Sequence, residues 1–383
     1  MRYALLDDKF KQVASVSYYK SLIWTERFDE PGDFELYIPM DESLPQIYQI
    51  GYYLWCSDSE YLMVIENRKV ESDPEDGDFY LITGRSVESI LDRRVVWDRT
   101  DFVEKDDVEP NLQNGVKKLL NENLINPAML PRKIENFIFE ETTDEVITKL
   151  TLIASYLGQD LLDVISKLCK EEEIGFKVTL NDDDKFVFKL IAGTDRTYDQ
   201  TENPYVLFSP KRKNIINTNY LESTKTYKNV ALIVGETETK TDKDGNEYVV
   251  SRIDYEFSVL NDDQTYAFTG LDRREVFVDA TSLKLEDGDN GVRTAEEYQA
   301  LLRKRGIDAL IEGAITTAFD GELVPDVMYE YGKDYYIGDL VQFEDLFGHE
   351  GIARVTEFIR SHDDNGMTMY PTFTIIEKGV YET

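Results

Sequence analysis

The sequence contains little histidine and little cysteine for its length. Its 383 residues include two of each, His349 and His362, and Cys56 and Cys169. The two histidines lie too far apart for the HExxH motif of zinc proteases, and their small number argues against a multi-histidine metal site within one chain. The cysteines lie far apart and form no CxxC pair, so we expect neither a disulfide framework nor a thiolate metal site. This usage fits synthesis in a reducing compartment.

The chain also lacks a long apolar run and an excess of positive charge. No segment approaches the roughly 18 apolar residues that a membrane span requires, and residues 1–8 become acidic too early for a signal peptide. We therefore expect a soluble protein that is not secreted by that route. The 42 Lys and Arg against 76 Asp and Glu give a net charge of −34. This charge argues against specific nucleic-acid binding and against stable anchoring on anionic membranes.

Catalytic signatures are absent as well. The chain has no GxSxG elbow, no P-loop and no GxGxxG, which removes the usual marks of hydrolases, phosphate-binding and dinucleotide-binding proteins. A glycosidase needs only two carboxylates beside a cleft, so the many acids leave that class open by count. Three tryptophans could stack on sugars, but we expect them to anchor cores or interfaces: Trp24, Trp55 and Trp97.

Clusters of aspartate also admit two interpretations. They could bind calcium, but none has the ligand spacing or closing Glu of an EF-hand loop. We interpret them as hairpin turns, which favour Asp and Gly, and we expect His349 and His362 to be solvated turn residues. The clusters are Asp182-Asp183-Asp184, Asp242-x-Asp244-Gly245 and Asp287-Gly288-Asp289. We predict no catalytic, cofactor-binding or metal-binding residue.

What the sequence does contain is aromatic and apolar residues in a β-like pattern. There are 24 Tyr and 19 Phe, and 42% of the residues are hydrophobic, enough for the cores of two to four domains. A short pattern near the start recurs near the end. Tyr48-Gln49-Ile50-Gly51 is echoed by Tyr335-Tyr336-Ile337-Gly338, and each is followed by an apolar run, a turn and a further strand. The echo indicates a duplicated β-module. Chance recurrence of turn residues is the alternative.

The patterns along the chain predict four regions. Residues 1–98 alternate as antiparallel strands and form a first β-barrel, and residues 99–203 form an α+β insert. A second, discontinuous β-barrel comprises residues 204–270 and 325–383, with a helix-containing insert at residues 271–324. The predicted fold class is a β-rich α+β protein with two related antiparallel β-barrel domains and α+β inserts. Aromatics such as Tyr48, Tyr52, Tyr335 and Tyr336 are expected to support the barrels rather than bind a ligand.

Individual elements of the inserts can be predicted too. Apolar spacing predicts helices over residues 111–124 and 161–169, and residues 176–180 and 186–190 form a hairpin. Thr294-x-x-Glu297 resembles a capping box that opens a helix, as does Thr142-x-x-Glu145. The segment after Glu145 fits either a helix or a strand.

Several short motifs resemble the siphophage tail-hub family of tail-associated proteins (Gp37-like), which occur in phages and prophages. Each is weak alone, but their order and spacing along nearly the whole chain are specific. They are Trp24-Thr25-Glu26-Arg27, Pro31-Gly32-Asp33-Phe34-Glu35-Leu36, Gly84-Arg85-Ser86, Ile90-Leu91, Arg94, Trp97, Gly158 with Leu161-Leu162, Gly193 with Arg196, Tyr227-Lys228-Asn229-Val230, Gly332 with Asp334, Gly338-Asp339, Thr356-Glu357 and Pro371-Thr372-Phe373.

The resemblance implies a fold similar to the hub of contractile phage baseplates, with two related barrels per subunit in a pseudo-sixfold ring of three chains. The implied role is a non-enzymatic virion protein that closes the tail tube and opens for DNA passage. Its implied partners are two further copies of the chain, the distal tail protein ring, a tip fibre or spike protein, and a tape measure protein. The implied location is the tail tip, after synthesis in the cytoplasm of the bacterial host. No cofactor is implied.

Two departures from the family pattern matter. Thr374 follows Pro371-Thr372-Phe373 where glycine is expected, and the sequence ends at Thr383, whereas many relatives continue into a fibre or a wall-degrading domain. Host binding and lysis would then belong to other proteins. The alternatives are a tail-associated peptidoglycan-degrading enzyme, a carbohydrate-binding receptor module, and the hub of a phage-like bacteriocin or injection particle.

Overall fold

The computed structural model divides the chain into two compact units. Unit 1 consists of Met1–Tyr220 and Phe319–Ile376, and unit 2 of Leu221–Ala318 and Glu377–Thr383. The residues that the structure describes are 1–73, 77–102, 111–152, 154–241, 243, 247–251, 254–258, 265–281, 283, 293–313, 316–324 and 328–375.

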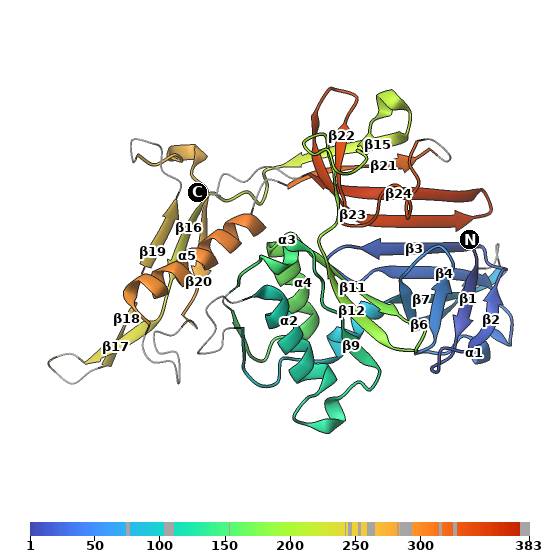
Figure 1. The fold of residues 1–383 in the computed structure, drawn as a ribbon, viewed down its shortest axis with the longest axis horizontal. Coiled ribbons are helices and arrows are strands. Elements are labelled where there is room, and N and C mark those ends of the chain that lie inside the picture. The colour runs from blue at the N-terminus through green and yellow to red at the C-terminus, as the bar shows by residue number, and fades with distance from the viewer. Residues whose placement is uncertain are drawn as a thin grey trace. The chain divides into compact units, whose positions relative to one another are not determined.

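One large mixed sheet dominates unit 1 (Figure 1). Among the described residues it has fourteen strands, and its main path runs β15-β21-β24-β23-β3-β4-β7-β6-β5-β1-β2. Strand β22 also pairs with β23, and β13 and β14 pair with β22. The bounds are β1 (Tyr3–Leu6), β2 (Gln12–Val16), β3 (Ser21–Arg27), β4 (Asp33–Pro39), β5 (Tyr53–Cys56), β6 (Leu62–Asp73), β7 (Gly77–Ser86), β13 (Asp195–Arg196), β14 (Leu207–Phe208), β15 (Ile215–Ser223), β21 (Thr316–Leu323), β22 (Leu340–Glu344), β23 (Glu350–Asp363) and β24 (Gly366–Ile375).

The same strand order occurs twice in this sheet. In the first repeat the neighbours run β3-β4-β7-β6-β5, and in the second they run β15-β21-β24-β23-β22. The two repeats join where the second half of β23 pairs with β3, from Glu357 opposite Arg27 to Asp363 opposite Ser21. A mixed α+β, sheet-rich fold is therefore confirmed. The described strands form an open sheet with β15 and β2 at its ends, and no closed barrel is seen among their pairings.

Each repeat carries the same backbone irregularity at the same place. The N–H of Gly51 donates to the carbonyl of Ile65 at 2.9 Å, and the N–H of Gly338 donates to that of Val355 at 2.7 Å. Both glycines have positive φ, 88° and 89°, which other residues rarely adopt. The register of β6 shifts directly after Ile65, and that of β23 directly after Val355. The echoed tetrapeptides thus mark equivalent turns beside equivalent β-bulges.

An α+β region lies between the two repeats along the chain. Three strands form a small sheet in the order β11-β12-β9, and the apolar faces of α2 and α4 belong to the same core cluster as that sheet. The elements here are η1 (Val87–Arg93), β8 (Thr100–Asp101), α2 (Leu112–Leu120), η2 (Asn121–Ile125), η3 (Leu130–Arg132), β9 (Phe137–Phe139), α3 (Glu145–Thr148), β10 (Ser155–Tyr156), α4 (Leu161–Glu171), β11 (Gly175–Leu180) and β12 (Phe186–Ile191). Outside this region unit 1 also contains α1 (Leu44–Ile47) and η4 (Pro210–Arg212).

Most of the local predictions for this region are confirmed. Both helices form, and the β11–β12 hairpin pairs from Gly175 opposite Ile191 to Leu180 opposite Phe186. The predicted capping box at Thr142 is wrong. Asp144 caps α3 instead, because its carboxylate accepts the Val146 N–H at 2.9 Å while the Thr142 hydroxyl accepts the N–H of Asp144. The undecided segment after Glu145 forms one helical turn and then the short strand β10.

Unit 2 is a smaller α+β unit. Its helix α5 packs its apolar side chains on the sheet β19-β16-β20, and Tyr298 and Leu302 are fully buried in that core. The predicted capping box at its start is confirmed: Thr294 and Glu297 bond each other's backbone N–H groups at 2.8 and 3.2 Å. Its elements are β16 (Val230–Val234), β17 (Thr237–Thr241), β18 (Glu247–Ser251), β19 (Asp254–Ser258), η5 (Gly270–Asp272), β20 (Glu275–Asp279) and α5 (Ala295–Glu312).

Candidate functional site

A buried ion pair lies where the two repeats meet. Arg360 on β23 and Glu26 on β3 pair with almost no exposure to solvent. The Glu26 carboxylate also accepts from the hydroxyls of Ser59 at 2.6 Å and Tyr331 at 2.7 Å. Arg360 further donates to the carbonyl of Asp58 at 3.1 Å and lies over the rings of Tyr331 and Phe358. A buried charge pair of this kind is stabilised only by such additional hydrogen bonds.

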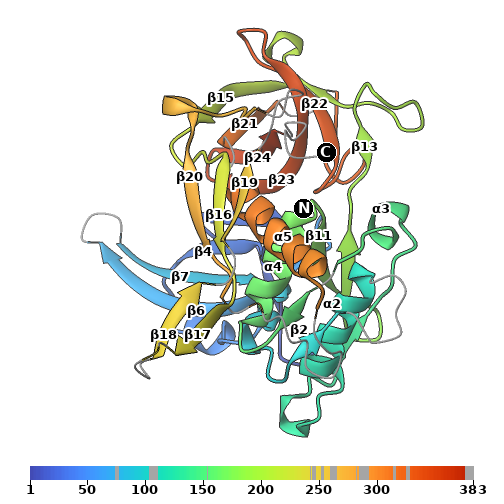
Figure 2. The same ribbon diagram turned by 90° about the vertical axis from the view of Figure 1, so that its left-hand side faces the viewer.

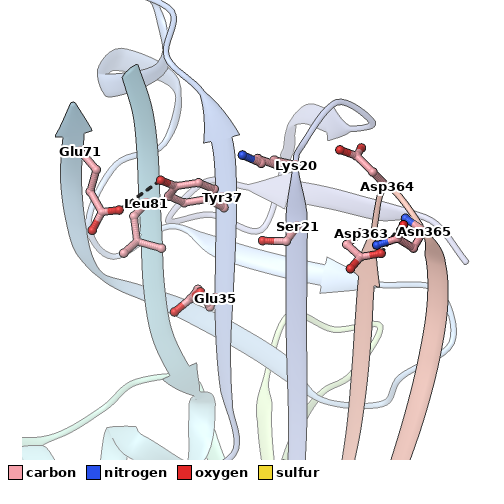
Figure 3. Close-up of a pocket in the computed structure, with 9 residues that line it drawn as sticks. All are labelled: Lys20, Ser21, Glu35, Tyr37, Glu71, Leu81, Asp363, Asp364 and Asn365. Atoms are coloured by element: carbon pink, nitrogen blue, oxygen red, sulfur yellow. Dashed lines mark hydrogen bonds between the residues drawn. The ribbon is translucent and has the colours of Figure 1, made fainter. Parts of the chain in front are cut away.

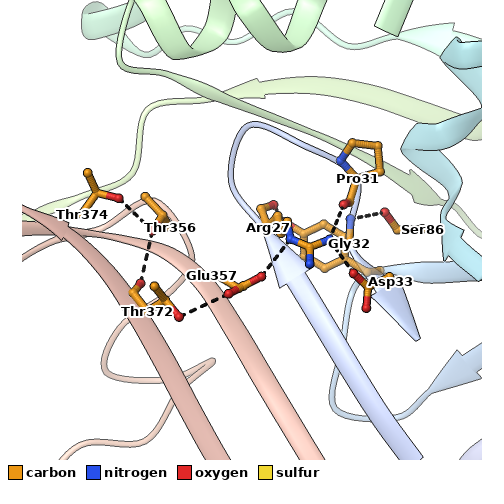
Figure 4. Close-up of polar contacts among 10 residues, drawn as sticks. Arg27, Pro31, Gly32, Asp33, Ser86, Thr356, Glu357, Thr372 and Thr374 are labelled. Carbon is orange, nitrogen blue, oxygen red and sulfur yellow. Dashed lines mark hydrogen bonds and ion pairs between the residues drawn. The ribbon is translucent and has the colours of Figure 1, made fainter. Parts of the chain in front are cut away.

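A second charged cluster lies at the adjoining turn (Figure 4). Arg27 pairs with Asp33 at 2.6 Å and with Glu357 at 2.8 Å, and donates to the carbonyl of Pro31. Thr356, the extra residue of the β23 bulge, contacts the hydroxyl of Thr374 at 3.2 Å. Residues far apart in the sequence thus share one structural role, which is to hold the junction of the repeats.

Two motif glycines are explained by close backbone contacts. A Cβ atom at Gly84 would lie 1.8 Å from the carbonyl oxygen of Val64, and one at Gly32 would lie 2.1 Å from that of Thr25. No other residue fits such a contact without a shift of the backbone. Gly32 also donates its N–H to the hydroxyl of Ser86 at 2.8 Å. The Gly84-Arg85-Ser86 and Pro31-Gly32-Asp33 motifs are therefore structural.

The motifs at Gly193 and Gly338 converge in the same way. Arg196 and Asp339 form a largely buried ion pair at 2.6 Å, and Asp339 also accepts from the backbone N–H groups of Thr194 and Tyr336. A Cβ at Gly193 would lie 2.0 Å from the carbonyl oxygen of Gly338. This cluster connects the end of the α+β region to the second repeat. It is a structural contact and contains no reactive group.

The solvent face of the sheet carries acidic side chains. A shallow depression there is lined by Glu35, Glu71, Asp363 and Asp364 together with Lys20 (Figure 3). A neighbouring depression adds Asp33 and Glu66. Strands from both repeats contribute to this face, because β4, β7, β3 and β23 are consecutive in the sheet. We call these acidic residues of Figure 3, Glu35, Glu71, Asp363 and Asp364, the acidic face.

Within the acidic face, the pKa of Glu71 is shifted, and the shift is downward. The Lys69 ammonium, and then the Tyr37 hydroxyl, hydrogen-bond to Glu71 and hold the pKa of its carboxyl below the usual range. Among the described carboxyl groups, the largest rise in pKa occurs outside the acidic face. Burial raises the pKa of Glu88 in η1 to about 7, but this side chain is enclosed in the core. A general acid must reach a substrate, so Glu88 is no candidate for one.

The histidines and tryptophans take different positions. His349 lies in the β22–β23 turn, as predicted, with its ring 4.9 Å from the Tyr220 ring and its Nδ1 2.6 Å from Asp345. The prediction that His362 lies in a loop is wrong, because this residue is part of β23 and bonds the Tyr19 hydroxyl. Trp24 is fully buried in the core, as expected. Trp55 and Trp97 are partly exposed, and the Arg132 guanidinium lies over the Trp97 ring.

The remaining predicted residues concern metals and thiols. Asp182–Asp184 occupy the turn of the β11–β12 hairpin, as predicted. The residues Asp242, Asp244 and 287–289 lie outside the described residues. Cys56 and Cys169 are free and buried. Within the described ranges, no three His, Cys, Asp or Glu residues gather as a metal site would require. In that same part of the chain, no helix has the length and apolar character needed to span a bilayer.

Comparison with known protein families decides the identity. The profile of the Siphovirus ReqiPepy6 Gp37-like proteins matches residues 2–373. The chain belongs to this Gp37-like family. The resemblance carried by the short motifs is therefore confirmed, and the structure explains several of them as turns, bulges and buried ion pairs of the fold. Among curated proteins, no sequence matches this Gp37-like chain.

Solved structures share the fold of this Gp37-like protein at low sequence identity. The 43 kDa tail protein of prophage MuSo2 from Shewanella oneidensis is similar with a TM-score of 0.55 and 10% identity, covering 97% of this chain and 98% of its own. A tail protein from Neisseria meningitidis has a TM-score of 0.53, 11% identity and coverage of 100% and 98%. Prophage tail protein gp18 from Listeria monocytogenes has a TM-score of 0.50, 11% identity and coverage of 99% and 96%.

Proposed function

We propose that the protein is a structural component of a phage tail, namely the hub at the tail tip. Its family and its likeness to prophage tail proteins support a place in a tail. The single observation that carries the hub assignment is the repeated strand order, with equivalent bulges after Ile65 and Val355. A homotrimer of a chain with two such repeats has six similar modules. It would match a sixfold tail tube above and a threefold tip below.

In this proposal the two repeats act as two related β-modules. The first module is built from residues 1–98, and residues 99–203 form the α+β insert between the modules. Strands β15, β21, β22, β23 and β24 form the second module, and the chain between Ser223 and Thr316 is inserted between β15 and β21. The ring would contact the distal tail protein ring on one side and a tip fibre or spike on the other, with a tape measure protein as a further partner.

The charge of the protein supports a passage for DNA. We propose that the acidic face lines the channel of the ring and that the ring closes the tube until the particle engages a host. Carboxylates on a channel wall repel the phosphate backbone, so DNA would pass without adhering. A structure of the ring with a neutral or basic channel wall would contradict this part of the proposal.

The proposed role requires no enzymatic activity. The alternative of a peptidoglycan-degrading enzyme is tested by incubating purified protein with cell-wall sacculi and measuring release of soluble fragments. Release of fragments that is lost on replacing a pair of carboxylates would overturn the non-enzymatic role. A carbohydrate-binding receptor module would instead bind specific glycans on an array.

The test of the hub is the oligomeric state and symmetry of the purified protein. We expect a species of three times the chain mass of 44.4 kDa at high protein concentration. Electron microscopy without imposed symmetry should give threefold rings with six similar lobes. A protein that stays a monomer at high concentration, and also in the presence of the distal tail ring, would refute the hub.

A further inference from the structure

One half of β6 has a strand on one side only. Residues 62–64 of β6 pair with β5, whereas residues 67–73 pair with β7 and with no other strand of the described chain. The β6 and β7 arrows run out together as a long ribbon (Figure 2). An unpaired edge of this length is a template for another strand.

The equivalent half-strand in the second repeat is paired on both sides. Residues 357–363 of β23 follow the bulge as residues 67–73 of β6 do, and they pair with β24 on one side and β3 on the other. The strand that corresponds to β3 in the second repeat is β15, and β15 is the last strand of the sheet. Among the described strands of this sheet, the unpaired half of β6 and the terminal strand β15 therefore correspond to the pair β23–β3 that is joined within the chain.

We propose that residues 67–73 of β6 in one protomer pair with β15 of the next copy of this chain, in the way that β23 pairs with β3. This inference rests on the proposed trimer and specifies its contacts. The contact joins different surfaces of the two copies, so it propagates head to tail and closes into a ring. Every junction in the ring would then have the same strand order.

The turns beside the two junctions support this partner. In the first repeat, the β5–β6 turn covers the internal junction, because Ser59 bonds Glu26 on β3 and the carbonyl of Asp58 accepts from Arg360 on β23. In the second repeat, the β22–β23 turn covers β15, since the His349 ring stacks on the Tyr220 ring. By the same geometry, this turn extends over the neighbouring copy's β6.

The residues on that turn have the chemistry of an interface anchor. Phe347 is 88% exposed and Leu346 is 63% exposed, although both lie in an ordered turn. Buried Asp345 holds the turn through the N–H groups of Phe347 and His349, both at 2.8 Å. A large apolar side chain presented on a preorganised turn loses little conformational freedom on binding. Phe347 is also an aromatic residue, and aromatic side chains contribute most to the energetics of cores and interfaces.

The residue that would receive Phe347 is apolar as well. Val70 follows the β6 bulge by the same number of residues as Arg360 follows the β23 bulge, and Val70 is 54% exposed. Glu71 bonds Tyr37 on the solvent face, so Val70 points to the opposite, core-side face, where Arg360 is buried in the second repeat. At the internal junction of β23 and β3, Arg360 therefore pairs with Glu26. At the junction between copies, Phe347 of one copy would pack on Val70 of the next.

Two variants test the contact by sedimentation velocity over a range of protein concentrations. Phe347→Asp and Val70→Asp should each raise the dissociation constant of the trimer by at least about 100-fold, since a carboxylate would be buried without a partner. Leu130→Asp, at an exposed position on η3 of the insert, is the matched control and should leave the trimer intact. Circular dichroism checks that each variant folds.

Cross-linking gives an independent measurement. Cysteine at both positions in one chain (Phe347→Cys with Val70→Cys) should yield covalent trimers with a short bismaleimide, because native Cys56 and Cys169 are buried. A mixture of the two single variants should stop at covalent dimers. If the wild type is a trimer but neither aspartate variant weakens it and no cross-link forms, this inference is wrong and the hub stands. If the wild type forms no trimer at high concentration, alone or with the distal tail ring, both are overturned.

Discussion

Glu88 offers a direct test of the electrostatics of the core. Its side chain is fully buried at the start of the α+β region. One carboxylate oxygen accepts the Val178 N–H at 2.6 Å, and the other has no hydrogen-bond partner. Loss of hydration on burial raises its pKa from 4.5 to about 7, against the opposing effect of the hydrogen bonding that the carboxylate does receive. The neutral acid is therefore the form that the core stabilises.

The sign of the effect on stability follows from this direction. A pKa raised in the folded state means that the folded protein binds the proton more tightly than the unfolded chain. The contribution to folding is fully present below pH 4.5 and is lost as the pH rises through about 7. From the two pKa values, the loss amounts to about 3 kcal/mol at pH 8.

The perturbation that isolates this contribution is Glu88→Gln. An amide is neutral at every pH, so the variant should match the wild type near pH 4 and exceed its free energy of unfolding by about 3 kcal/mol at pH 8. Urea unfolding followed by tryptophan fluorescence between pH 4 and 8 measures the difference. Glu42→Gln, at an exposed position, is the control for loss of one negative charge from an acidic protein. Parallel pH curves for Glu88→Gln and the wild type would refute the reasoning.

Three further predictions concern the fold. Gly84→Ala should destabilise unit 1 by more than Gly51→Ala. The first variant places a methyl group against a backbone carbonyl, whereas the second costs only the roughly 1–2 kcal/mol of a positive φ. Chemical denaturation measures both free energies of unfolding, and an equal loss in the two variants would contradict the close contact. Arg360→Met should cost about 3–5 kcal/mol, and adding Glu26→Leu should recover at least about 1 kcal/mol, in a double-mutant cycle by the same method. If the double variant is no more stable than Arg360→Met, the cost of the single variant does not come from leaving the Glu26 carboxylate buried without its partner. Asp160 is the N-cap of α4, and its carboxylate accepts two backbone N–H groups. Asp160→Ala removes these hydrogen bonds and should lower the free energy of unfolding by about 1 kcal/mol. Thermal unfolding measures the loss, and an unchanged melting temperature would contradict a stabilising role of the cap.

Local chemistry made much of the structure predictable. The helices over residues 111–124 and 161–169 follow from apolar spacing, and the hairpin of residues 176–190 follows from alternation around a polar turn. These elements depend on residues near one another in the chain, because the spacing of the apolar residues sets which face of a helix or strand is buried. Local patterns fail where two caps compete. Thr142 and Asp144 are both good cap residues, and in the structure the Asp144 carboxylate accepts the Val146 N–H while the Thr142 hydroxyl accepts the N–H of Asp144.

The duplicated β-pattern can be recognised in the sequence, because a glycine with positive φ stands shortly before β5 in the first copy and before β22 in the second. It also indicated the family, through residues that the fold requires at its turns and bulges. The folded chain was needed to show that both copies lie in one open sheet and that Arg360 pairs with Glu26. These contacts join strands more than 300 residues apart, and no local period specifies which strand edges pair. That choice depends on which faces can be buried together once the whole chain has folded.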